Sequence, residues 1–183
     1  IGTALREYDG ATTVASAAIT LPAGETWTDV VDAGAVVLAT ATDGRIYSLK
    51  DVSSAFVSKG QTEITGEKPI SIIESQGQIF YGTREDTTTA KAIGRFYRAT
   101  LTVADDLYVL SNNQLIKEWN VSGTDSTPYN LFATRDSVYM GIRETSNSYL
   151  WRYYLPTAGI ARDLKFDSAG IVRGIGIVNE KLQ

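Results

Sequence analysis

The amino-acid sequence predicts an all-β fold, a β-propeller-type array of four-stranded antiparallel blades. Short runs of apolar and aromatic residues alternate with turn dipeptides such as Asp43-Gly44 and Gln76-Gly77, the pattern of strands joined by tight turns. The pattern recurs at roughly the 40–50-residue period that is typical of propeller blades. Helical periodicity is weak throughout the chain, which also favours an all-β fold.

The clearest internal repeat relates residues 78–85 (QIFYGTRE) to residues 137–144 (SVYMGIRE). The apolar positions fall in register, Gly82 aligns with Gly141, and both segments end in Arg-Glu. A polar loop and a second aromatic strand follow each segment. Each copy is therefore expected to form the central hairpin of one blade.

The second strand of each hairpin carries a large aromatic residue at one register, namely Tyr47, Tyr97 and Trp151. Tyr47 ends the sequence GRIY and Tyr97 ends the similar sequence GRFY. We expect these rings to fill the gaps between stacked sheets, since each buries roughly 150–250 Å². Gly82 and Gly141 are expected where another segment approaches the backbone closely.

The repeat divides the chain into an N-terminal strand or linker segment, 1–25, and propeller blades over 26–183. The expected blades span approximately 26–67, 68–104, 105–127, 128–168 and, as a partial fifth, 169–183. The third blade is short, because a hairpin over 107–119 that turns at Asn112-Asn113 leaves room for too few strands. Either this blade is compressed or residues are missing near 99–104.

The array is expected to belong to something larger. Four blades and part of a fifth, without closure, would leave apolar faces and strand edges exposed. The sequence starts at Ile1 and stops in an apolar run at Gln183. We therefore expect a fragment of a longer protein, whose remainder or partner chain closes or covers these blades.

Composition excludes several functions for this chain. The 17 Lys and Arg residues are scattered among 21 Asp and Glu residues, with a net charge of −4, so a general nucleic-acid binder is not expected. No apolar stretch approaches the ~20 residues of a membrane span. Cysteine and histidine are both absent, which excludes thiolate nucleophiles and any imidazole base within it. We expect no enzyme activity, no catalytic residue, no metal and no cofactor.

Acidic residues supply the remaining chemical alternatives. Asp29, Asp32, the pair Asp105-Asp106 and the pair Glu85-Asp86 offer carboxylates, and a glycoside hydrolase on a propeller scaffold would need two of them about 5–10 Å apart. Adjacent acids in turns are more commonly solvated loop residues. None of these groups has the spacing of a calcium loop.

Two further features have both a functional and a structural interpretation. The Arg-Glu pairs at 84–85 and 143–144 recur at strand ends; we interpret them as charged ends that lead into solvent loops, with contact to a partner chain as the alternative. Trp119 beside Asn120 is the first place to look for a sugar site. An exposed aromatic there would favour a carbohydrate-binding, lectin-like propeller.

Residues 29–49, 133–139 and 149–164 resemble the propeller-like region of minor tail proteins from long-tailed bacteriophages, particularly those that infect actinobacteria. The resemblance implies a structural virion protein of the tail tip or baseplate. Its expected partners are other phage tail proteins, together with a host-surface glycan or protein if its loops take part in host attachment. The lectin-like module and the propeller hydrolase stay as alternatives.

Overall fold

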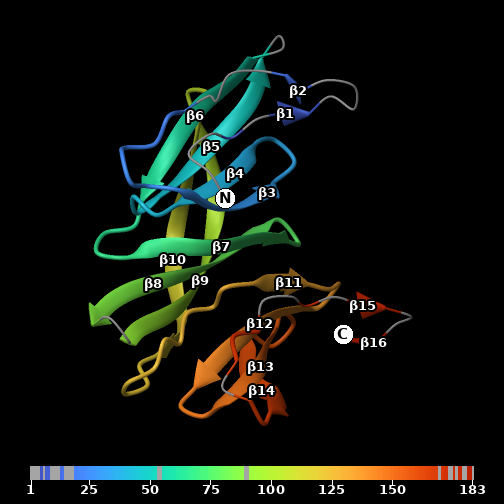
Figure 1. Cartoon of the computed structure of the whole chain (residues 1–183). Helices are drawn as coiled ribbons and strands as arrows, with labels where there is room; N and C mark the ends of the chain where they lie inside the picture. The colour runs from blue at the N-terminus through green and yellow to red at the C-terminus, as the bar shows by residue number, and fades with distance from the viewer. Residues whose placement is uncertain are drawn as a thin grey trace.

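A computed structural model of the chain describes residues 5, 7–8, 13–14, 19–52, 55–88, 91–168, 170–172, 175, 177–178 and 181–182. Within these residues all regular elements are β-strands and none is a helix, so the predicted all-β class is confirmed. They likewise contain no helix that is long and apolar enough to cross a membrane. The strands form three four-stranded antiparallel sheets and two separate short hairpins (Figure 1).

Each sheet follows the order of the chain. The first sheet consists of β3 (Trp27–Asp32), β4 (Val37–Ala41), β5 (Arg45–Val52) and β6 (Ala55–Glu63). The second sheet consists of β7 (Lys68–Ser75), β8 (Gln78–Thr88), β9 (Lys91–Ala104) and β10 (Leu107–Trp119). The third sheet consists of β11 (Leu131–Ala133), β12 (Ser137–Glu144), β13 (Asn147–Tyr154) and β14 (Gly159–Phe166).

The two short hairpins lie near the ends of the chain. They are β1 (Glu7–Tyr8) with β2 (Thr13–Val14), and β15 (Ile177–Val178) with β16 (Lys181–Leu182). Between them the three sheets stack in chain order (Figure 1). The first strands lie side by side, with β7 between β3 and β11, and the outer strand β10 contacts β6.

The second sheet is buried on both faces. The neighbouring residues Phe80 and Tyr81 are each at most 1% exposed. Tyr81 packs toward the first sheet with Leu38, and Phe80 packs toward the third sheet with Met140. Since successive side chains of a strand point to opposite faces, two consecutive buried aromatic residues mark a strand that is covered on both sides.

The recurring aromatic residues occupy equivalent places in the three sheets. Tyr97 stacks on Tyr81 in the gap between the first and second sheets, with ring centroids 5.0 Å apart. Trp151 meets Trp119 edge to face at 5.5 Å between the second and third sheets. Tyr47 packs on the outer face of the first sheet, in one cluster with Leu5, Ile19 and Leu21. The predicted role of Tyr97 and Trp151 in filling the gaps is confirmed.

The number of sheets differs from the prediction, because residues 107–119 form one strand and not a hairpin. Within the described chain Asn112 has a positive φ of 52° and its neighbour Asn113 does not. A tight hairpin turn of type I′ needs two such residues, whereas a single one inserts a bulge. β10 accordingly continues past a register shift between Ser111 and Gln114. It is the fourth strand of the second sheet, and β9 runs unbroken through 99–104.

Glycine permits the sheets to come together closely, as predicted for Gly82 and Gly141. A Cβ atom added to Gly82 would fall inside 3.0 Å of Pro128, and one added to Gly141 inside 3.0 Å of Val172. Gly94 is the tightest case, because a Cβ there would collide with the backbone carbonyl of Ser126. The segments that lead out of the second and third sheets therefore cross directly over glycine backbone.

We expect Gly94→Ala to lower the free energy of unfolding by about 3 kcal/mol, because the backbone that a new methyl group would meet can move only by opening the junction. The measurement is the urea midpoint. Gly159→Ala is the matched control, since Gly159 is exposed in β14 and its added Cβ would meet only the Thr157 hydroxyl. Equal midpoints for the two variants would contradict the account of the junction.

Candidate functional site

One side-chain hydrogen bond recurs where each sheet meets the segment that follows it. The donor lies at the start of one sheet, and the acceptor is a backbone carbonyl of the next segment. In the first two bonds the acceptor stands two residues before the next donor. The three bonds are Thr28 Oγ1 to Pro69 O at 2.9 Å, Ser71 Oγ to Pro128 O at 2.5 Å, and Asn130 Nδ2 to Val172 O at 3.3 Å. We call these the junction hydrogen bonds.

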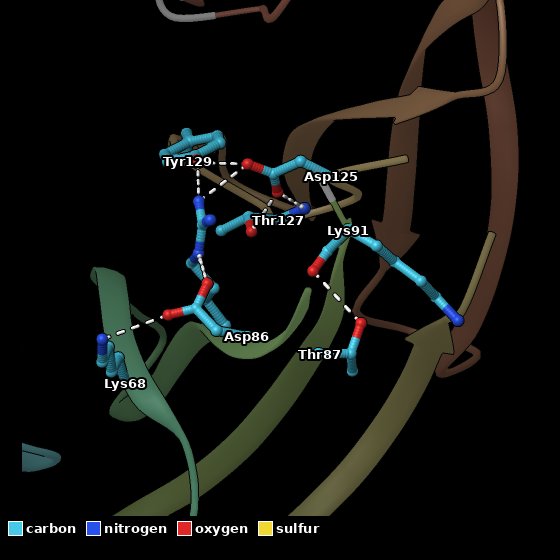
Figure 2. A network of polar contacts seen from close by, with 8 residues as sticks. Lys68, Asp86, Thr87, Lys91, Asp125, Thr127 and Tyr129 are labelled. Atoms are coloured by element: carbon cyan, nitrogen blue, oxygen red, sulfur yellow. Dashed lines mark hydrogen bonds and ion pairs between the residues drawn. The ribbon is translucent and has the colours of Figure 1, made fainter. Parts of the chain in front are cut away.

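A charged network joins the second sheet to the segment that leads into the third (Figure 2). At its centre Arg84 of β8 donates to Asp86 at 2.6 Å and to Asp125 at 2.7 Å, and also to the hydroxyl of Tyr129. Lys68 of β7 binds the other oxygen of Asp86 at 3.1 Å. We call these five residues the Arg84 network. It links two strands of one sheet to a segment about forty residues further along the chain.

Local backbone geometry holds Asp125 in place for this network. Its Oδ1 accepts hydrogen bonds from the backbone N–H of Thr127 at 3.1 Å and from the Thr127 hydroxyl at 2.6 Å, which makes an Asx turn. Its Oδ2 accepts from the Tyr129 hydroxyl at 2.6 Å. These hydrogen bonds hold the carboxylate in the orientation in which it meets Arg84.

Both carboxyl groups of the network have lowered pKa values. Hydrogen bonding to Arg84 is the main cause for Asp86, and Lys68 adds to it. Burial raises the pKa of Asp125, but the hydrogen bonds from Thr127 and Tyr129 and the charge of Arg84 outweigh burial, so the pKa falls below its ordinary value. Both groups therefore stay ionised in the folded protein at neutral pH.

A second cluster of charges surrounds Arg95 at the same end of the second sheet. Its guanidinium forms ion pairs with Glu67 at 2.9 Å, Glu85 at 2.7 Å and Glu118 at 2.7 Å. Glu67 also accepts a hydrogen bond from the Tyr97 hydroxyl at 2.9 Å. Burial and this bond raise the pKa of Tyr97. The cluster ties three strands and the connection before β7 to one cation.

A polar groove of about 390 Å³ lies beside these clusters, between the ends of the first and second sheets. Its charged lining includes Asp43, Glu67, Lys68 and Arg84. Each of these four side chains already forms an ion pair inside the protein. A ligand that used their charges would have to displace those partners, at the cost of leaving a charge unpaired.

The acidic residues considered from sequence serve separate structural purposes. Asp29 accepts hydrogen bonds from the backbone of Ile72 at 2.9 Å and of Val30 at 2.8 Å, and burial raises its pKa. Asp32 accepts from the N–H of Gly34 in the β3–β4 turn.

Glu85 and Asp86 form ion pairs with Arg95 and Arg84. The last two acids, Asp105 and Asp106, form the tight β9–β10 turn, with φ values of 51° and 61°. Asp106 also forms an ion pair with Lys59 of β6. The six carboxylates thus have separate structural partners, at a sheet junction, at two turns and in the two charged clusters.

Two interpretations from sequence need correction. Trp119 is only 4% exposed and packs against Trp151, so it cannot stack on a sugar at the surface. Arg84 does not lead into solvent, because its side chain crosses the junction to Asp125. Its repeat equivalent Arg143 has a buried Nε that lacks a hydrogen-bond partner among the described residues.

Sequence analysis did not single out Asp125 or Tyr129. The Asp-x-Thr pattern at 125–127 was the available signal for an Asx turn. What the turn would face depends on the stacking of the sheets, which local sequence does not reveal.

The described part of the chain contains no group of three or more Asp, Glu, His or Cys side chains that is arranged to hold a metal ion. A scan against protein-family models and a search of curated proteins find no match to this sequence. The contacts of the site itself are hydrogen bonds and ion pairs between neighbouring sheets, and they indicate its role.

Replacing Arg84 by Gln should lower the free energy of unfolding by about 2 kcal/mol at pH 7, because Asp86 and Asp125 lose their charged donor. Folding lowers both pKa values, so this stabilisation is present above the ordinary value of 3.8 and is lost as the pH falls through the folded values. The difference between wild type and variant should therefore shrink at pH 3. Urea unfolding at pH 7, 5 and 3 measures it.

Arg98→Gln is the matched control for this experiment, since Arg98 is half-buried and donates to the neutral side chain of Gln114. Its effect should be small and independent of pH. If the difference in free energy of unfolding between wild type and Arg84→Gln stayed constant down to pH 3, the carboxylates of Asp86 and Asp125 would not be the partners of Arg84.

Proposed function

We propose that this chain is a structural, non-enzymatic module whose three sheets are consecutive blades of a β-propeller. The shared strand order, the adjacent first strands and the contact between the outer strands β6 and β10 support this arrangement. The observation that carries the proposal is the recurrence of one hydrogen bond at every junction, from Thr28, Ser71 and Asn130. Side chains at equivalent positions are used to join sheets.

We assign the module to the tail tip or baseplate of a bacteriophage, where it assembles with other tail chains. The resemblance of residues 29–49, 133–139 and 149–164 to minor tail proteins supports this assignment. The charged clusters are consistent with it, because their ion pairs are made within the chain and join its sheets. In this role the polar loops at the strand ends face the partner proteins or the host surface.

Peptide mapping of purified virions tests the assignment. Peptides of this sequence are expected in the tail fraction of particles, and antibodies against the exposed segment 157–165 should label the tail tip in electron micrographs. A protein that is abundant in infected cells but absent from intact, washed particles would refute the virion role.

The polar groove between the first two sheets is where we test the lectin-like alternative. Because Lys68 and Arg84 are already paired there, we expect no signal on a glycan array at micromolar protein concentration. Binding that Lys68→Ala abolished, and that the distant control Lys165→Ala left unchanged, would replace the structural proposal with a carbohydrate-binding one.

A further inference from the structure

The hairpin β15–β16 has the place and register of the first hairpin of a sheet. Val172 stands where Pro128 stands one sheet earlier, because its carbonyl accepts the junction hydrogen bond from Asn130 and its side chain lies against Gly141. The residues five and ten positions further on are Ile177 and Leu182, and they are paired. The residues five and ten positions beyond Pro128 are paired in the same way in β11–β12, and those beyond Pro69 in β7–β8.

The hairpin β1–β2 has the register of the second half of a sheet. Thr26 precedes the junction donor Thr28 by two residues, as Pro69 precedes Ser71. The paired residues Tyr8 and Thr13 lie eighteen and thirteen positions before Thr26.

In the third sheet the pair Tyr154 and Gly159, at the corner of β13–β14, lies eighteen and thirteen positions before Val172. Four residues separate the paired positions in both hairpins. The hairpins β15–β16 and β1–β2 are thus complementary halves of one four-stranded repeat.

The outward face of the third sheet is covered over only its inner half. Val172 covers Gly141 of β12. Directly across the sheet from that region, Leu164 and Phe166 of β14 remain 49% and 40% exposed. They share the covered face, because Leu164 pairs with buried Leu150, and Leu150 in turn pairs with Gly141. Between the first two sheets the outer strand β10 contacts the outer strand β6.

We propose that β15–β16 of one copy of the chain and β1–β2 of a second copy combine into a fourth four-stranded sheet, in the order β15-β16-β1-β2. This contact would place the partner's hairpin over Leu164 and Phe166. It would also pair β16 with β1, each of which has a single strand partner within the described part of the chain. A second copy is the occupant because the two hairpins form separate sheets within one chain, at opposite ends of the stack of three sheets (Figure 1).

The contact is head-to-tail, so it generates a ring or a filament of copies. The inference deepens the proposed structural role and rests on its sheet stacking, but it does not depend on residence in a virion. Peptide mapping and the experiment below can therefore fail independently.

The register of the third sheet fixes the expected cross-strand pairs. Val138 pairs with Tyr153 and Ser137 with Tyr154. Transferred to the composite sheet, these pairs place Leu182 opposite Glu7 and Lys181 opposite Tyr8. Residues directly opposite in an antiparallel pair are close enough for a disulfide after small adjustments. The chain contains no cysteine, so cysteines introduced at these positions can react only with each other.

The experiment mixes two single variants, Tyr8→Cys and Lys181→Cys, under mild oxidation and follows covalent dimers on non-reducing gels. Only an interchain contact can produce the mixed dimer. A second mixture, Glu7→Cys with Leu182→Cys, tests the same register at the neighbouring pair. Both should give about tenfold more mixed dimer than Glu7→Cys with Lys181→Cys, whose one-residue register shift puts the two side chains on opposite faces.

A double variant, Tyr8→Cys with Lys181→Cys, separates this proposal from closure within one chain. It should form covalent dimers and longer ladders. A fast-migrating cross-linked monomer without ladders would overturn the proposal in favour of a closed ring of four sheets in one chain. Equal dimer yields from the in-register and shifted pairs, or no mixed dimer from either in-register pair, would overturn it as well.

Discussion

A sheet that is apolar on both faces has to be covered on both, and the architecture of this protein depends on that constraint. The second sheet shows it most clearly, because Tyr81 is buried against the first sheet and Phe80 against the third. Burial of side chains of this size contributes about 2 kcal/mol each, which no single sheet can gain alone. Stacking is therefore a condition for folding, and each sheet is stable only beside a neighbour.

Close stacking of sheets also requires that the polar groups of the connecting segments find hydrogen-bond partners. The segment from Thr124 to Pro128 crosses the glycine backbone of β8 and β9, and there it exchanges backbone hydrogen bonds with Ala92. The junction hydrogen bonds and the Arg84 network then pair the polar groups that this crossing buries. Polar groups removed from water without partners would cost about 1–3 kcal/mol each. The charged residues at this end of the sheets thus stabilise the stack, and this supports the proposed structural role.

Much of the architecture could be predicted from local sequence, and the errors have physical causes. The matching strands at 78–85 and 137–144, each the first of a hairpin, were predicted because strand alternation and turn chemistry are local. The expected separate blade at 105–127 was wrong. In sequence, a strand that continues through a bulge at Asn112 resembles a hairpin that turns at Asn112-Asn113. Trp119 was considered as a surface residue because nothing nearby in sequence shows that Trp151 covers it.

The sequence by itself determined the all-β class, the aromatic positions that recur between sheets and the glycines at which backbone can approach, because each of these follows from the geometry of short segments. Only the tertiary structure decided which charges meet. Arg84 and Asp125 lie 41 residues apart and become partners only when the segment after β10 crosses the second sheet. Such pairing depends on how whole sheets are placed, and the energy that places them comes from apolar burial spread over many residues.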